Sequence, residues 1–185
     1  MNQRPYQFSN PDGVYFTTFS IINWIDVFTR ERYKQEIVQS LNFCQKFKGL
    51  EIFAWCLMTN HLHLVIRAKK GCKLSDIVRD FKKYTAARII KSIQNIEEPE
   101  SRREWMLWMF ERAARKNIRN SRYQFWQQNN HAEELYSVKF IQQKIKYIHE
   151  NPVKEGITEK PWEYLYSSSR DYEANQKGLV EIIFV

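Results

Sequence analysis

The fold of this chain is decided by residues 54–67, which read AWCLMTNHLHLVIR. The stretch is mostly apolar, yet it carries His61 and His63, two of the four histidines in the protein. If its second half is a strand, alternation places both imidazoles on one face and apolar side chains on the other. A histidine-apolar-histidine step on a rigid strand can hold a divalent ion. The same pattern also fits an ordinary half-buried strand with two hydrogen-bonded histidines.

A strand and a helix are predicted before this stretch. Residues 14–21 are rich in β-branched and aromatic side chains and follow a Pro-Asp-Gly turn signal, which is typical of a strand. In residues 29–47 the apolar side chains recur at spacings of three and four, which predicts an amphipathic helix. We expect Thr29 to cap this helix and Gly49 to end it.

A hairpin and a second helix are predicted next, and they complete most of a known order of strands and helices. Strands over residues 50–58 and 61–68 are separated by two residues, which predicts an antiparallel pairing. Residues 73–93 predict a helix, with Ser75 as a cap. The order strand, helix, strand, strand, helix predicts an α+β fold, a ferredoxin-like (RRM-like) antiparallel sheet with helices on one face. We expect residues 123–127 to supply the missing fourth strand.

Length and charge limit the classes of protein to which the chain can belong. The chain has 185 residues and no low-complexity segment, so we expect one domain over residues 1–185. The net charge of +8 and the pI of 9.4 favour an acidic partner, nucleic acid before membrane. No stretch is long and apolar enough for a signal peptide or a membrane span, which predicts a cytoplasmic protein without a membrane partner. The three cysteines are widely spaced, and we expect them to be reduced.

A basic helical segment is expected over residues 97–130. Within it, residues 101–122 carry seven basic and two acidic side chains, interleaved with Trp105, Trp108 and Phe110. Such a mixture suits a nucleic-acid surface, since the charges meet phosphates and the rings stack on bases. A solvated helix with aromatic core residues explains it equally well. The candidate DNA-contacting residues of this segment and of the second helix are Lys82, Lys83, Arg88, Arg102, Arg103, Arg112, Arg115, Lys116, Arg119 and Arg122.

The C-terminal tail, residues 157–185, is rich in aromatic residues. Single-stranded bases can stack on such side chains, so we expect the tail to take part in recognising single-stranded or hairpin DNA. Its last residues, 179–185, are apolar enough to dock as an edge strand.

The last clear helix is predicted over residues 137–150, ended by Pro152 and Gly156. Tyr147 and Asn151 are four residues apart and share a face of this helix. The tyrosine could act as a nucleophile and the asparagine oxygen as a ligand to the ion that the histidines hold. Taken alone, a tyrosine at such a position is more often a packing residue. Because Asn151 precedes a proline, we expect it at the frayed end of the helix.

Two motifs together resemble a known family. Residues 57–63 read LMTNHLH and residues 147–156 read YIHENPVKEG. This combination resembles the single-tyrosine transposases of the HUH endonuclease superfamily, and most of all their REP-associated branch, from about residue 14 to residue 172. The resemblance implies the HUH endonuclease type of fold and a nuclease that cuts single-stranded DNA beside hairpins. It implies phosphotyrosine chemistry at Tyr147, with Mg²⁺ or Mn²⁺ held by His61, His63 and Asn151.

Some alternatives stay open at this stage. Tyr84 lies among basic residues and is a rival nucleophile, but its i+4 neighbour is an arginine, which cannot bind a metal and so favours Tyr147. His149 is expected on a different helix face from Tyr147. The chain could also be a DNA or RNA hairpin binder that does not cut, or a metal hydrolase that activates water. We expect a monomer or a weak homodimer.

Overall fold

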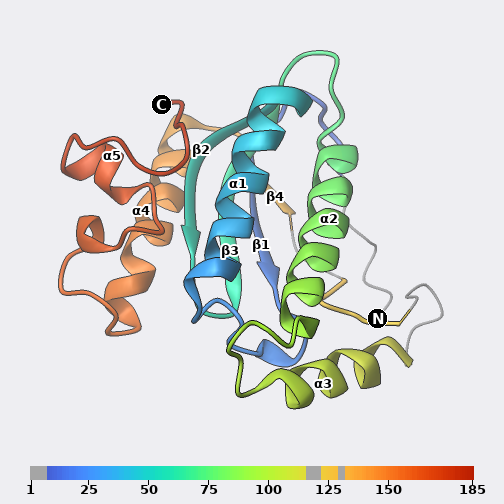
Figure 1. Ribbon diagram of the computed structural model, residues 1–185. Helices are drawn as coiled ribbons and strands as arrows, with labels where there is room; N and C mark the ends of the chain where they lie inside the picture. Colours follow the sequence, from blue (N-terminus) through green and yellow to red (C-terminus); the bar gives the residue numbers. More distant parts are fainter. Residues whose placement is uncertain (1–7, 116–121, 129–131) are drawn as a thin grey trace, which may run out of the picture.

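A four-stranded antiparallel sheet forms the centre of the molecule (Figure 1). The computed structural model describes residues 8–115, 122–128 and 132–185. The strand order β2-β3-β1-β4 is that of a split β-α-β fold, so the predicted α+β, ferredoxin-like class is confirmed. The strands are β1 (Tyr15–Ser20), β2 (Leu50–Leu57), β3 (His61–Ala68) and β4 (Ala132–Glu134).

The helices lie on both sides of this sheet, so the prediction that they lie on one face is correct for α1 and α2 but wrong for α4. Figure 1 shows α1 and α2 across one face and α4 on the other side, near β2 and β3. No helix of the described residues has the length and apolar character needed to cross a membrane. The helices are α1 (Glu31–Lys48), α2 (Leu74–Gln94), α3 (Arg103–Arg115), α4 (Val138–Lys154) and α5 (Ser169–Glu173), with short 3₁₀ turns η1 (Ile22–Trp24) and η2 (Pro161–Glu163).

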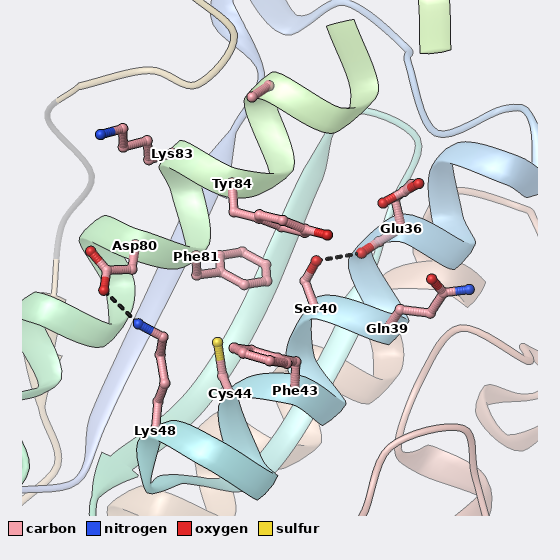
Figure 2. Close-up of a pocket in the computed structure, with 11 residues that line it drawn as sticks. Glu36, Gln39, Ser40, Phe43, Cys44, Lys48, Asp80, Phe81, Lys83 and Tyr84 are labelled. Carbon is pink, nitrogen blue, oxygen red and sulfur yellow. Dashed lines mark hydrogen bonds and ion pairs between the residues drawn. The ribbon is translucent and has the colours of Figure 1, made fainter. Parts of the chain in front are cut away.

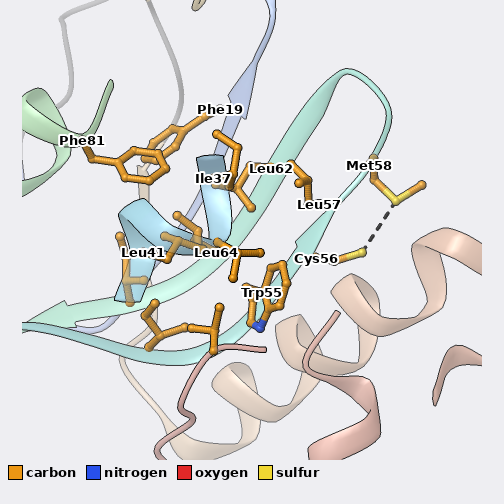
Figure 3. Close-up of a cluster of buried hydrophobic side chains, with 14 of the residues drawn as sticks. Phe19, Ile37, Leu41, Trp55, Cys56, Leu57, Met58, Leu62, Leu64 and Phe81 are labelled. Carbon is orange, nitrogen blue, oxygen red and sulfur yellow. Dashed lines mark hydrogen bonds between the residues drawn. The ribbon is translucent and has the colours of Figure 1, made fainter. Parts of the chain in front are cut away.

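Alternation along β3 separates the core from the histidines. Leu62 and Leu64 are buried and point towards α1, where Figure 3 shows them beside Ile37 and Leu41. His63 lies between these leucines in sequence and therefore points to the opposite face, towards α4. The burial of the two leucines thus fixes the register that presents the histidine pair.

The predicted caps of the two long helices are only partly correct. Thr29 does not cap α1, because its hydroxyl oxygen accepts a hydrogen bond from Arg102 instead. Ser75 does not cap α2, whose N-cap has no side-chain hydrogen bond. Gly49 does end α1: its φ of 73° is left-handed, and a Cβ there would lie 2.7 Å from a cysteine sulfur.

The fourth strand is not where it was predicted. Residues 123–127 form only an isolated bridge between Trp126 and Ile21, whereas β4 pairs with β1. Phe125 and Trp126 are instead buried in the hydrophobic core. Their aromatic character therefore reflects packing and not strand pairing. In the expected basic helical segment, helix is present over α3, while residues 116–121 and 129–131 lie outside the described residues.

Helix α4 runs through Pro152 to Lys154, so Asn151 is inside the helix and not at a frayed end. Proline has no N–H to donate to the carbonyl four residues earlier, that of Ile148. The side-chain nitrogen of Asn151 donates to this carbonyl at 3.4 Å and to that of Tyr147 at 2.7 Å. The asparagine side chain thus replaces the missing donor, which explains why the helix continues.

The C-terminal segment covers the free edge of β2. Leu57 donates its backbone N–H to Tyr166, and Ser168 donates its own to Trp55. Residues 179–185 do not form the predicted edge strand, although Ile183 donates a backbone hydrogen bond to β2. The edge is therefore blocked by a short irregular pairing.

Three aromatic residues of the tail are part of this packing. Tyr164 and Tyr166 are buried, and the hydroxyl of Tyr164 donates to the Leu57 carbonyl at 2.7 Å. The hydroxyl of Tyr172 donates to the Phe53 carbonyl at 2.8 Å. The prediction that the tail aromatics stack on bases is wrong for these three residues, because their rings and hydroxyls are already used inside the protein.

His149 joins α4 to the same segment. Its Nε2 lies 2.8 Å from the hydroxyl of Ser168, which is fully buried and also bonds the backbone of Trp55. As expected, it does not share the face of Tyr147. Burial lowers the pKa of His149 to about 4, although the Glu173 carboxylate lies 3.8 Å from its Nδ1.

We expect this buried histidine to make the fold acid-sensitive. In the unfolded chain its pKa is near 6.5, so between about pH 6.5 and pH 4 the unfolded state binds a proton that the folded state excludes. Stability therefore falls as the pH falls, by an amount on the order of 1–2 kcal/mol at pH 5 from this residue. Thermal unfolding followed by circular dichroism at pH 7.5, 6 and 5 measures the effect. His149→Gln should show a shallower loss of Tm, and an equal slope for both proteins would contradict this account.

Candidate active site

The two predicted histidines form a close pair on β3. Their Nε2 atoms are 3.0 Å apart. The outward nitrogens are both held: Nδ1 of His61 lies 2.7 Å from the Oδ1 of Asn60, and Nδ1 of His63 lies 2.7 Å from the hydroxyl of Thr18 on β1. Each imidazole thus has a second partner that sets its orientation, as in metal sites of proteins.

The amide of Asn60 fixes the tautomer of His61. Its nitrogen donates to Oδ1 of Asp26 at 2.8 Å, and the hydroxyl of Thr59 donates to the same carboxylate oxygen at 2.7 Å. The amide oxygen therefore faces His61 and can only accept, so Nδ1 of His61 carries the hydrogen. Its Nε2 is left with a free lone pair, which is the form that binds a metal ion.

Thr18 plays a more flexible part at His63. A hydroxyl both donates and accepts, so it satisfies Nδ1 of His63 in either neutral tautomer. Without an ion, the Nε2–H of His63 can donate to the lone pair of His61 across 3.0 Å. When Thr18 accepts from Nδ1–H instead, both Nε2 atoms present lone pairs to the same point.

Burial keeps both rings uncharged. It lowers the pKa of His61 to about 4. The pKa of His63 falls to about 3, mainly because of burial and to a smaller extent because of the neighbouring His61. His63 is only 5% exposed. Both imidazoles are therefore neutral at physiological pH and available as ligands.

Tyr147 of α4 lies against this pair. Its ring meets that of His63 edge to face at a centroid distance of 5.8 Å, and that of Phe16 at 6.0 Å. The Tyr147 side chain is 44% exposed, so a strand of nucleic acid can reach it. The ammonium group of Lys154 lies 5.4 Å from the tyrosine ring centroid. A phenol and two neutral imidazoles are thus brought together, and the nearby Lys154 forms an ion pair with Glu150 at 2.9 Å.

Asn151 follows Tyr147 by one helical turn. Because its nitrogen donates back to helix carbonyls, its Oδ1 points away from them, and no described residue bonds this oxygen. Within the part of the chain that the structure describes, no group of three or more His, Cys, Asp and Glu could hold an ion. A third protein ligand beside the two histidines would therefore be of another type, such as this amide oxygen.

The spacing of the histidine nitrogens fits a divalent ion. Two nitrogens bound at about 2.1 Å and at right angles to each other are separated by about 3.0 Å. The observed separation has this value. Imidazole nitrogens with an amide oxygen admit Mg²⁺ or Mn²⁺, and also Zn²⁺ or Ni²⁺.

Tyr84 is not part of this arrangement. It lines a groove of about 700 Å³ between α1 and α2, with Phe43 and Phe81 (Figure 2). These helices cover the face of the sheet opposite to His63. The rival nucleophile is therefore separated from the histidine pair by the sheet.

The candidate DNA-contacting residues of α2 differ in their surroundings. The ammonium group of Lys82 donates to the carbonyl of Gln127 at 2.8 Å, and burial lowers its pKa to about 8. Arg88 forms an ion pair with Glu36 at 2.9 Å. Lys83 is exposed. Of the three, Lys83 is thus the residue most accessible to a phosphate.

Arg102 and Arg103 bind the protein's own backbone. Arg102 donates to the carbonyl of Asp26 at 2.7 Å and also pairs with the buried carboxylate of Glu100. Arg103 donates to three carbonyls at the end of α2, including that of Ile93 at 2.8 Å. These contacts account for both arginines without DNA. Arg102 also connects α3 to the loop of Asp26, and so indirectly to His61.

The remaining candidates lie on or after α3. Arg112 lies over the ring of Trp108 at 5.2 Å, and both are open to solvent on one side. Arg115 pairs with Glu111, and Arg122 is exposed beside an aromatic ring. Lys116 and Arg119 lie outside the described residues.

Sequence reasoning missed the residues that orient the histidines. Thr18 and Asp26 are far from the motif in sequence, and nothing in their own surroundings marks them. Asn60 lies inside the quoted stretch, directly before His61, and an amide beside a candidate ligand was a usable signal.

The chain is similar to known transposases. A family model described as "Transposase IS200 like" matches residues 15–110, just over half of the chain. The matched region includes His61 and His63 and ends before Tyr147 and Asn151. No curated protein matches the chain.

Two solved structures show the same kind of likeness. One is a REP-associated tyrosine transposase bound to a REP hairpin: it is 17% identical with a TM-score of 0.65, and the alignment covers 99% of this chain and 92% of that one. This similarity confirms the fold. The other is a putative transposase from Deinococcus radiodurans, 17% identical over 81% of this chain and 96% of that one; its TM-score of 0.44 is too low to support an argument.

We expect Thr18→Val to weaken the binding of Mn²⁺ by about 10- to 100-fold, because His63 loses the partner that orients it. Isothermal titration calorimetry of the DNA-free protein measures the affinity. Thr18→Ser keeps the hydroxyl and should bind nearly as the wild type does. Equal affinities of the valine and serine variants, at equal Tm, would show that Thr18 has no part in metal binding.

Proposed function

The chain belongs to the IS200-like transposase family, and from this membership we propose that it cuts and rejoins single-stranded DNA beside hairpins, with Tyr147 as the nucleophile. The observation that carries the proposal is the contact of this exposed tyrosine with the His61–His63 pair. A packing tyrosine has no need of two neutral, oriented imidazoles beside it.

His61, His63 and Asn151 would hold the divalent ion, Mg²⁺ or Mn²⁺. The support is the 3.0 Å spacing of the two Nε2 atoms, their fixed Nδ1 partners and the unbonded Oδ1 of Asn151. When bound, such an ion would supply Lewis-acid stabilisation of the negative charge on the scissile phosphate. The uncharged state of both imidazoles keeps them competent ligands down to mildly acidic pH.

Tyr147 performs the covalent step in this proposal. Its hydroxyl oxygen forms a bond to phosphorus in line with the O3′ leaving group, and the bond from phosphorus to O3′ breaks. The phenol proton passes to solvent, and the departing O3′ takes up a proton to become a 3′-hydroxyl. The product is a 5′-phosphotyrosyl link, which a second 3′-hydroxyl reverses to complete strand transfer. Lys154, close to the tyrosine ring, pairs with Glu150 at 2.9 Å and would exchange this partner for the phosphate.

The exposed cations would hold the rest of the DNA. Lys83, Arg112, Arg115 and Arg122 are the accessible members of the predicted set, and the pairing of Arg112 with Trp108 offers both a charge and a stacking surface. The similar solved structure is bound to a REP hairpin, which supports hairpin-containing DNA as the substrate. The weaker candidates for DNA contact are Arg102, Arg103 and Lys82, because each already has a partner within the protein.

A monomer is the oligomeric state that we propose. The edge of β2 is covered by residues 166–168, and the opposite edge is β4, which is only 3 residues long. Within the described residues, neither edge offers a long free strand to a second copy. The alternative of an RNA-binding module that stacks bases on its open sheet is less well supported, because α4 lies against the face that carries His63.

A cleavage assay tests the proposed reaction. The purified protein is incubated with Mn²⁺ and a labelled hairpin oligonucleotide from the DNA beside its own gene, and products are separated on a denaturing gel. We expect a protease-sensitive protein–DNA adduct that Tyr147→Phe reduces by at least about 10³-fold, because the variant lacks the attacking oxygen. Tyr84→Phe is the matched control and should leave the adduct unchanged.

The other outcomes separate the rival functions. Cleavage that persists in Tyr147→Phe without any adduct would indicate a hydrolase that activates water. Tight binding without cleavage over several ions and flanking sequences would indicate a binding protein.

A further inference from the structure

An exposed indole stands directly beside the histidine pair. Trp24 is 56% exposed, and its ring meets that of His61 edge to face at a centroid distance of 5.9 Å. Large apolar side chains are costly to leave in water when they could be buried. One face of this ring is thus offered to solvent next to the candidate active site.

The backbone is strained at the residue that carries this indole. Asn23 and Trp24 have φ values of 54° and 55°, in the left-handed region that bulky residues rarely adopt. Such a conformation persists only where neighbouring contacts enforce it, and it is concentrated at functional sites. Here the Trp24 N–H donates to the carbonyl of Ile21 at 3.1 Å, and its own carbonyl accepts from Asn60. The amide that orients His61 therefore also holds the tryptophan.

A cleft of about 340 Å³ opens between this tryptophan and the end of α4. Its volume is at the lower end for small-molecule sites, which suits one flat aromatic ligand. Its walls combine apolar side chains with a few polar groups. The lining residues are Trp24, Met58, Thr59, Asn60, His61, Glu155 and Ile157.

The negative charge of Glu155 limits the kind of ligand that the cleft can bind. Glu155 lines the cleft and is exposed, and among the described residues no cation or hydrogen-bond donor pairs with its carboxylate, which can only accept hydrogen bonds. This negative charge repels a phosphate but accepts N–H groups. A nucleobase fits these conditions: it stacks on an indole and donates hydrogen bonds from its edge.

We propose that this cleft holds the unstacked base of a nucleotide that flanks the phosphate attacked by Tyr147. The base stacks on Trp24 and donates its edge to Glu155. Guanine suits the carboxylate best, because its N1–H and N2–H groups are adjacent donors that match the two carboxylate oxygens. This inference rests on the proposed function, since His61 belongs both to the cleft and to the candidate metal site. It adds a specificity-determining pair of residues to that site.

Binding measurements without cleavage test the proposal. Tyr147→Phe protein in EDTA is titrated into a fluorescent hairpin oligonucleotide with single-stranded flanks, and each flanking nucleotide is replaced in turn by an abasic site. We expect one position at which the loss of the base weakens binding about 5- to 150-fold, the range typical of one base stacked on an aromatic ring. Adding Trp24→Ala should cause a similar loss on the intact DNA and no further loss on that abasic DNA.

Matched variants separate stacking from other effects. Trp24→Phe should keep most of the affinity, and Phe47→Ala, which removes a ring 63% exposed on α1, should leave it unchanged. Glu155→Gln should abolish the preference for guanine over inosine, which lacks the N2 amino group, at the sensitive position. Because these side chains are exposed, the Tm of each variant should equal that of the parent.

The outcomes also separate this inference from the proposed function. The base cleft would be ruled out if Trp24→Ala did not change the binding affinity. It would also be ruled out if the loss of affinity from Trp24→Ala added fully to the loss from every abasic site. Both results would leave the nuclease proposal intact. A failure of the parent protein to bind any of the oligonucleotides would overturn both.

Discussion

The period of two along β3 is the constraint on which the rest of the structure depends. Leu62 and Leu64 are buried beneath α1, and their burial forces His61 and His63 to the opposite face. A shift of the register by one residue would turn the imidazoles towards α1 and the leucines towards α4, so the core and the candidate site are specified by the same contacts. The packing energy of the sheet thus also positions the ligands.

Around this pair, a chain of hydrogen bonds orients the two imidazoles. Asp26 orients Asn60, which orients His61, while Thr18 adapts to either tautomer of His63. Burial removes the positive charge that would compete with a metal ion. At the rim, Lys154 lies beside Tyr147 and pairs with Glu150, and Glu155 lines the neighbouring cleft. In the proposed mechanism this arrangement separates a place for phosphate from a place for a base.

The sequence alone was sufficient where short-range patterns decide the structure. The alternation at His61 and His63, the stop at Gly49 and the shared helix face of Tyr147 and Asn151 follow from periodicity and backbone preference. The sequence was insufficient where a contact with a distant residue, or a side-chain hydrogen bond, replaces the interaction that local preferences predict. Thr29 could not be recognised as a partner of Arg102, nor the Asn151 amide as the donor that carries α4 past a proline. The 3-residue β4 carries no pattern of its own and depends on pairing with β1.

The central claim is that the tyrosine beside the histidine pair is the residue that becomes joined to DNA. The most direct measurement is mass spectrometry of the trypsin- and nuclease-digested reaction of the wild-type protein with a single-stranded hairpin substrate and Mn²⁺. The account predicts a nucleotide adduct on the peptide of residues 147–154, at Tyr147. An adduct on a different tyrosine, or cleaved DNA with no modified peptide, would contradict it.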